Sequence, residues 1–154
     1  QNQELFSRHI EPLFFTFLKD RANTIREAGV RRIAALIQTF KTTWFLNNCL
    51  PKLTETLIKS NPYLLRITGL YCLKAAAQAL PSETVSEKIL PLLLKNGKDE
   101  VANVRIVVVR IIKSLILKFD NNSVSFQVKP LLQELSNDQD KDVQFYAQEA
   151  LLSI

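Results

Sequence analysis

The stretch Asp99-Glu-Val-Ala-Asn-Val-Arg-Ile-Val-Val-Val-Arg-Ile-Ile-Lys-Ser-Leu-Ile116 poses the question on which the fold depends. Most of its residues are Val and Ile, whose branching at Cβ lowers helix propensity and favours a β-strand. The apolar run nevertheless continues to Phe119 without a turn residue, which is longer than an ordinary strand. The local sequence leaves both structures open, so the rest of the chain has to decide between them.

A repeat of about 40 residues runs through the chain and supplies that decision. Proline recurs at nearly constant spacing, at Pro12, Pro51, Pro91 and Pro130. Eight or nine residues after each proline comes a polar residue, here called the corner: Asp20, Ser60, Asp99 and Asp138. Six residues beyond the corners stand Arg26, Arg66, Arg105 and Gln144. Features that recur in phase indicate an array of four repeats.

Each repeat is predicted to contain two helices. In residues 25–40, the apolar residues Ile33, Leu36, Ile37 and Phe40 recur at i, i+3, i+4 and i+7, which is the period of a helix. The opening stretch is in register with this segment, so it is predicted to be helical because tertiary context overrides propensity. The predicted first helices are residues 4–19, 44–59, 83–97 and 126–137, and the second helices are 24–40, 63–80, 102–119 and 141–153.

The phased prolines predict a common bend in every first helix, because proline removes one backbone hydrogen bond and clashes with the preceding turn. Repeats that share one bend stack into a solenoid. We therefore expect an all-α solenoid in which four helix pairs stack as a right-handed superhelix. The repeats would form a single array, at residues 4–40, 44–80, 83–119 and 126–153, and because the sequence lacks Met, we interpret the array as part of a longer solenoid.

The corner residues and the arginines after them lie at the two ends of each predicted inter-helix turn. Stacked repeats would bring neighbouring turns together, so the arginines could form charge-assisted hydrogen bonds with carboxylates of adjacent turns. We expect a structural ladder that consists of Asp20, Arg26, Arg66, Asp99, Arg105 and Asp138. Ser60 leaves one rung without a charge, and Gln144 replaces arginine in the last repeat.

The composition points away from catalysis and from several kinds of partner. The net charge is +5, but the basic residues are scattered along the chain, so we expect no nucleic-acid partner. No apolar run approaches the roughly 20 residues of a membrane-spanning helix, so we expect no membrane partner. His9 is the only histidine, and Cys49 and Cys72 form no ligand motif. We therefore predict that the chain is not an enzyme and holds no metal or cofactor.

The helix-pair unit, with proline in the first helix, aspartate at the turn and arginine opening the second helix, resembles the HEAT repeat. Several segments also resemble the C-terminal repeats of the scaffold (A, 65-kilodalton regulatory) subunit of protein phosphatase 2A. These segments are residues 25–28, 62–66, 100–105, 128–130 and 138–151, together with Trp44. The similar segments occur in the same order and cover nearly the whole chain.

The resemblance implies a non-catalytic scaffold that binds the catalytic subunit of a serine/threonine phosphatase and holds it with a variable regulatory subunit. In that family the contacts are made by the inter-helix turns. Carried over to this sequence, the partner-binding residues are Asn23, Tyr63, Val101, Asn103, Asp140 and Lys141. Tyr63 and Val101 would be the apolar contacts, since an exposed apolar side chain at a turn has no internal use. A cytoplasmic location is expected, with the nucleus as a second one.

Departures from the family pattern leave alternatives open. Ser60, Glu100 and Gln144 differ from it, and this chain is basic where the family's scaffold is acidic. The HEAT-type regulatory subunit of protein phosphatase 4 carries similar motifs and is one alternative. A transport or adaptor protein that binds peptides in its concave face is another, although its groove would be apolar or acidic, whereas the second helices carry Arg31, Arg32, Lys74, Arg110 and Lys113.

Overall fold

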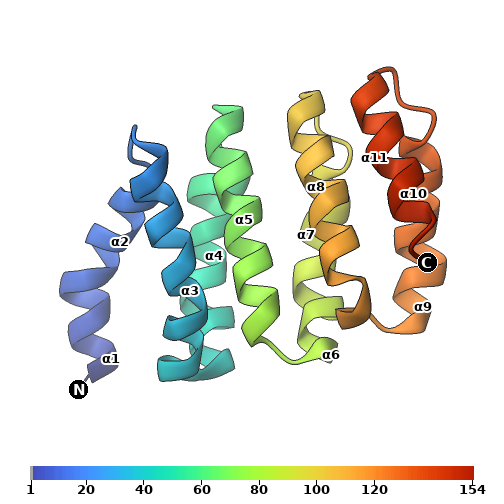
Figure 1. The fold of residues 1–154 in the computed structure, drawn as a ribbon. Helices are drawn as coiled ribbons and strands as arrows, with labels where there is room; N and C mark the ends of the chain where they lie inside the picture. Colours follow the sequence, from blue (N-terminus) through green and yellow to red (C-terminus); the bar gives the residue numbers. More distant parts are fainter. Residues whose placement is uncertain (1) are drawn as a thin grey trace. The chain divides into compact units, whose positions relative to one another are not determined.

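The computed structural model describes residues 2–154, which form helices and no strand (Figure 1). The chain divides into two compact units, Gln1–Ala79 and Leu80–Ile154. Each unit contains two of the four predicted helix pairs. The predicted all-α fold, built from antiparallel helix pairs, is confirmed.

Unit 1 contains the first two repeats. The first helix of repeat 1 is continuous through α1 (Asn2–Leu5), η1 (Phe6–Ile10) and α2 (Glu11–Leu18), and α3 (Asn23–Trp44) follows. Repeat 2 continues through η2 (Phe45–Cys49), α4 (Leu50–Leu53) and η3 (Thr54–Ile58) to α5 (Tyr63–Ala79). Helix α3 packs against both α2 and α5. The two first helices are joined by the Nζ of Lys52, which donates to the Oε2 of the buried Glu11 at 2.8 Å.

Unit 2 contains the last two repeats. Repeat 3 consists of α6 (Ser82–Thr84), η4 (Val85–Ile89) and α7 (Leu90–Asn96), then α8 (Ala102–Leu115) with the 3₁₀ turn η5 (Ile116–Lys118). Repeat 4 consists of α9 (Asn121–Ser123), η6 (Val124–Val128), α10 (Lys129–Leu135) and α11 (Lys141–Leu151). Helix α8 packs against α7 and α11.

The opening stretch is helical, as its phase in the repeat predicts. Residues 102–115 form α8, in which Val104, Val108, Val109, Ile111, Ile112 and Leu115 are buried. Two helices of unit 2 cover this apolar surface, and full burial of a Val or Ile side chain stabilises by about 1.5–3 kcal/mol. Burial therefore outweighs the few tenths of a kcal/mol per residue by which β-branched residues disfavour a helix.

Each phased proline follows a π-type turn. The residue before the proline donates its backbone N–H to the carbonyl five residues earlier, as Glu11 does to Phe6, Leu50 to Phe45, Leu90 to Val85 and Lys129 to Val124. A π-type turn is one of the ways in which a helix accommodates a residue that cannot complete the regular ladder. The repeated proline thus places the same irregularity at the same position of every first helix.

The first helix of repeat 4 begins earlier than the sequence predicts. It starts at Asn121 rather than at residue 126. The Asp120 carboxylate is the reason, because Oδ1 accepts from the Ser123 backbone N–H at 2.8 Å and Oδ2 accepts from the Ser123 hydroxyl at 2.7 Å. These bonds lower the pKa of Asp120 to about 2. By themselves Asn121 and Asn122 favour a turn, but the Asp120 cap stabilises them in the first turn of a helix.

The junction between repeats 1 and 2 lies at Lys41. Its φ of 73° and ψ of 166° are far from helical, so α3 contains the end of one repeat and the start of the next. A backbone in this region is strained for any residue with a Cβ, by about 1–3 kcal/mol. The lysine is exposed, and its Nζ donates to the Gln38 carbonyl at 3.2 Å.

We expect Lys41→Gly to stabilise unit 1. Removing the Cβ relieves the strain, and the gain exceeds the entropy that glycine loses on folding, which leaves about 1 kcal/mol. Urea denaturation followed by circular dichroism measures the change. Lys41→Ala is the matched control, because it removes the amine and retains the strain. A glycine variant no more stable than the alanine variant would contradict this account.

Candidate functional site

The inter-helix turns are closed first by the corner carboxylates. The Oδ1 of Asp20 accepts from the backbone N–H of Ala22 at 2.8 Å, that of Asp99 from Val101 at 2.9 Å, and that of Asp138 from Asp140 at 2.9 Å. In the second turn the corresponding residue is Pro62, which has no N–H to donate. The sequence can therefore carry Ser60 at that corner without leaving a turn N–H unpaired.

The side chain six residues after the corner closes each turn a second time. In three turns an arginine Nη1 donates to two carbonyls of its own turn: Arg26 to Asp20 (2.7 Å) and Arg21 (2.9 Å), Arg66 to Ser60 (3.0 Å) and Asn61 (2.6 Å), and Arg105 to Asp99 (2.7 Å) and Glu100 (3.2 Å). In the fourth turn Gln144 Nε2 donates to the carbonyl of Asp138. The sequence pattern predicts only bonds between turns for these arginines. Their use within the turn was missed, although it explains why Gln144 can replace arginine.

A bond between turns is also present in unit 2. The Nε and Nη2 of Arg105 donate to the Oδ2 and Oδ1 of Asp138, both at 2.8 Å. Both side chains are mostly buried, and the two parallel bonds have the planar geometry that guanidinium and carboxylate favour. The Arg105 hydrogen bonds are the main reason that the pKa of Asp138 is held below its ordinary value, and Asp138 in turn raises the pKa of Arg105.

The other expected ladder residues form hydrogen bonds within their own turns. In unit 1, the turn that follows Arg26 has Ser60 at its corner and offers no corner carboxylate. The Nη2 of Arg26 instead donates to Asn23 Oδ1, in its own turn, at 3.2 Å. Arg66 is buried against its turn carbonyls, and Asp20 and Asp99 cap the N–H groups of their own turns. These residues hold the shape of the turn in which they occur.

The expected partner-binding residues lie around the start of the second helices. Asn23, Tyr63, Asn103 and Lys141 are exposed, whereas Val101 and Asp140 are half-buried. Asn23 Nδ2 donates to Glu27 Oε1 at 2.6 Å. Leu64, which sequence reasoning did not single out, has 53% of its surface exposed. Its position directly after Tyr63 in a predicted turn was the signal that could have identified it.

The N-cap position of the second helix distinguishes the turns. Asp140 caps α11, because its Oδ1 accepts from the backbone N–H groups of Asp142 and Val143 at 2.9 and 3.1 Å. Val101 has the same extended backbone at the start of α8 and provides no cap. Valine there forgoes about 1 kcal/mol that a capping residue contributes. The Asp140 carboxylate therefore has a structural use, whereas the helix itself does not require Val101.

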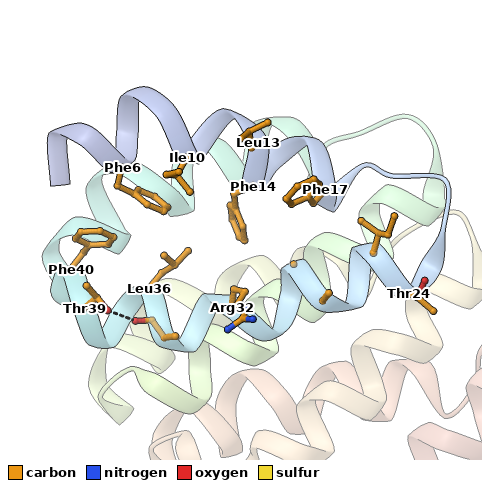
Figure 2. Close-up of a pocket in the computed structure, with 14 residues that line it drawn as sticks. Phe6, Ile10, Leu13, Phe14, Phe17, Thr24, Arg32, Leu36, Thr39 and Phe40 are labelled. Atoms are coloured by element: carbon orange, nitrogen blue, oxygen red, sulfur yellow. Dashed lines mark hydrogen bonds between the residues drawn. The ribbon is translucent and has the colours of Figure 1, made fainter. Parts of the chain in front are cut away.

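An apolar groove lies on the first repeat, between α1–α2 and α3 (Figure 2). Its cavity volume is about 900 Å³, and it is lined by Phe6, Ile10, Leu13, Phe14, Phe17, Thr24, Ile25, Ala28, Gly29, Arg32, Ala35, Leu36, Thr39 and Phe40. Figure 2 shows that the aromatic rings of Phe6, Phe14 and Phe40 lie between the two helices. About half of each of Ile10, Leu13 and Phe17 is exposed.

The residues that line the groove in repeat 1 have counterparts in repeat 2, and there the counterparts are covered. Residues 39 or 40 positions further along the chain correspond to its lining: Phe45 to Phe6, Cys49 to Ile10, Leu53 to Phe14, Cys72 to Arg32 and Ala76 to Leu36. All five are buried within unit 1, where repeat 1 packs against repeat 2. The groove is thus the face that, in repeat 2, receives the preceding helix pair.

The described residues show no metal-ligand cluster, no membrane-spanning helix and no exposed cysteine. Among residues 2–154, no three His, Cys, Asp or Glu side chains come together as a metal site, and no helix is long and apolar enough to cross a membrane. Both cysteines are buried and unpaired, and burial raises the pKa of Cys49 to about 12 and that of Cys72 further. Buried thiols of this kind pack as small apolar side chains.

Comparison with known proteins finds a partial sequence similarity and a likeness in fold. No family model matches the chain. A segment of 51 residues, one third of the chain, is 43% identical to the beta isoform of the 65 kDa regulatory (A) subunit of serine/threonine-protein phosphatase 2A from Homo sapiens, and likewise to those from Rattus norvegicus and Mus musculus. The match spans 8% of the length of these relatives.

The fold also resembles that of a solved helical-repeat protein, Cex1p. The likeness has a TM-score of 0.73 at 21% identity and covers 96% of this chain and 28% of that one. At this identity the match shows the fold alone, which is an all-α, HEAT-like helical repeat. The comparisons therefore support the broader HEAT-like assignment and leave the particular protein to be proposed.

We expect Arg105→Ala to destabilise unit 2 by about 2–3 kcal/mol, because it removes the turn closure and leaves a mostly buried carboxylate without its cation. Arg105→Lys should restore only part of the loss, since an ammonium cannot form both parallel bonds. Urea denaturation monitored by circular dichroism measures both changes. Lys98→Ala is the control, because Lys98 and its partner Glu134 are exposed and such a pair contributes less than about 1 kcal/mol.

Acid should weaken the same pair. The pKa of Asp138 is lowered in the folded chain, so its contribution is full above the ordinary carboxyl pKa of about 3.9 and is lost as the pH falls below it. Asp138→Asn should be less stable at neutral pH and should lose less stability on acidification. Parallel stability-against-pH curves for the two proteins would refute the coupling.

We expect the apolar groove to bind the dye 1-anilinonaphthalene-8-sulfonate, and Leu13→Ser with Phe17→Ser to reduce the fluorescence of the bound dye. Both side chains are about half exposed, so the double variant should remain folded. Leu117→Ser is the control, because Leu117 is 96% exposed and lies outside the groove. Equal loss of fluorescence in the control would show that the dye binds elsewhere.

Proposed function

We propose that this chain is part of a non-catalytic scaffold that binds a serine/threonine protein phosphatase catalytic subunit through its inter-helix turns. The observation that carries the proposal is the 43% identity, over one third of the chain, to a protein named as a regulatory subunit of phosphatase 2A. The HEAT-like fold supports it. In this role the scaffold contributes position and a raised effective concentration rather than a chemical step.

The turns offer a contact surface that combines apolar and polar side chains. Tyr63 is 37% exposed, and Leu64 beside it is exposed further. Val101 occupies a position at which a polar N-cap would stabilise α8, which supports a use outside the fold. Asn103 and Lys141, both exposed, would add polar contacts around these apolar groups. A variable regulatory subunit would complete the proposed assembly.

The apolar groove supports the further proposal that the four repeats belong to a longer array. In repeat 2 the corresponding face is covered by a helix pair, and stacked repeats generally cover such faces with a neighbour. A scaffold of this kind would hold the catalytic subunit with one group of repeats and the regulatory subunit with another.

We expect this chain to bind a purified phosphatase catalytic subunit, and Tyr63→Ala and Val101→Asp each to weaken binding by about tenfold, as loss of an apolar interface contact does. Val101→Asp is informative because aspartate can cap α8, so its melting temperature should not fall. Titration against catalytic subunits of the 2A and 4 types, by calorimetry, measures the affinities and shows which class is preferred.

Phe126→Ala is the control for this titration, because Phe126 is 78% exposed but lies within η6, away from the turns. It should bind like the unmodified chain. If the folded chain binds neither type of catalytic subunit, the phosphatase proposal is wrong. If Phe126→Ala weakens binding and the turn variants do not, the contact surface lies on the first helices.

A further inference from the structure

A second groove lies in unit 1, between the N-terminal parts of α3 and α5, with a cavity volume of about 530 Å³. Its α3 wall is mostly polar and consists of Asn23, Arg26, Glu27, Val30 and Arg31. Its α5 wall includes the apolar side chains of Leu64, Ile67 and Tyr71. We call it the α3–α5 groove. It opens beside the turn residues Asn23 and Tyr63 and is distinct from the apolar groove of the first repeat.

On the α3 wall, Arg31 has hydrogen-bond donors that are not used within the groove. Glu27 Oε1 accepts from Asn23 at 2.6 Å, whereas Glu27 Oε2 is 3.5 Å from Arg31 Nη2, at the limit of a hydrogen bond. The Arg31 side chain is 78% exposed. A guanidinium has five N–H donors, so Arg31 can bind a carboxylate without losing a strong internal contact.

The opposite wall exposes apolar surface to the same space. Leu64 is 53% exposed and Tyr71 is 39% exposed. Covering exposed apolar surface of this kind favours binding, because it removes that surface from water. The groove therefore combines a site for a negative charge with a site for an apolar side chain.

The distribution of charge in the chain favours an acidic ligand for unit 1. Unit 1 contains 11 Lys and Arg against 5 Asp and Glu, whereas unit 2 contains 9 against 10. Helices α3 and α5 together carry six basic residues and a single acidic one, Glu27. All of the net positive charge thus belongs to unit 1, where it would attract an acidic partner.

The corresponding cations of unit 2 have partners within their own unit. Arg110 lies over the Tyr146 ring, 5.6 Å from its centre, and Lys113 Nζ is 3.0 Å from Glu149 Oε1. In contrast, Arg32 and Lys74 of unit 1 form no ion pair with any residue in the range 2–154. These two charges therefore add to the attraction of unit 1 for an acidic ligand, although neither lines the α3–α5 groove.

We propose that the α3–α5 groove binds a short acidic peptide segment of a partner protein, with a carboxylate on Arg31 and one apolar side chain between Leu64 and Tyr71. The apolar wall distinguishes this ligand from a nucleic acid, which would need repeated phosphate contacts along a basic track. The groove shares Asn23 and Leu64 with the proposed phosphatase contact surface, but peptide binding to it can be tested without a phosphatase.

The test is fluorescence anisotropy with a fluorescein-labelled synthetic peptide in which glutamates flank a central leucine. We expect Arg31→Glu to weaken binding about tenfold, as loss of a charge-assisted hydrogen bond does, and Leu64→Ala to weaken it about fivefold. Arg8→Glu is the matched control, because it makes the same change of charge at an exposed residue of η1 that does not line the groove. It should change the affinity by less than about twofold at physiological salt.

Three results would overturn the proposal. Equal weakening by Arg8→Glu and Arg31→Glu would mean that the peptide responds only to net charge. Equal affinity for a peptide in which serine replaces the central leucine would mean that the apolar wall is not used. Displacement of the peptide by an oligothymidine at comparable concentration would identify a nucleic-acid surface instead. Thermal melts of all variants establish that each remains folded.

Discussion

The hydrogen bonds that close each inter-helix turn set the geometry on which the helix pairs depend. The last carbonyl groups of a helix have no partner within that helix, and here they are followed by a turn whose carbonyls point back toward the second helix. Arg26, Arg66, Arg105 and Gln144 meet these carbonyls from the first turn of the second helix. In each repeat, this one side chain therefore helps to fix the turn at which the second helix reverses the direction of the first.

The closed turns also determine which side chains face outward. In the third turn, Asp99 accepts from the backbone N–H of Val101, and Arg105 donates to the carbonyls of Asp99 and Glu100. The backbone groups of this turn are therefore paired without a side-chain cap from the N-cap residue. In repeat 3 this freedom is used by Val101, and in repeat 4 the position is occupied by the capping Asp140. The turns that begin α8 and α11 thus share an extended backbone at the N-cap and differ in the side chain that they present there.

The two units join their repeats through different ion pairs. Unit 2 joins its repeats through the Arg105–Asp138 pair and neutralises further cations on α8 with α11. Unit 1 joins its repeats through Lys52 and the buried Glu11 and leaves two grooves and a positive net charge.

The sequence by itself determined the repeat, the helical nature of the Val- and Ile-rich stretch, and the place of every inter-helix turn, because periodic burial and turn chemistry are recorded position by position. Only the folded structure decided that the phased arginines bind their own turns, that Lys41 breaks α3, and that Leu64 and Tyr71 face Arg31 across a groove. The sequence also places the start of the first helix of repeat 4 too late. The hydrogen bond that Asp120 accepts from Ser123 is seen only in the folded structure and is not part of the repeat pattern. The bonds of Arg26 and Asp120 are local, but they depend on backbone geometry that the repeat period does not specify. The groove depends on how α3 and α5 pack, and a one-dimensional period carries no measure of the distance between helices.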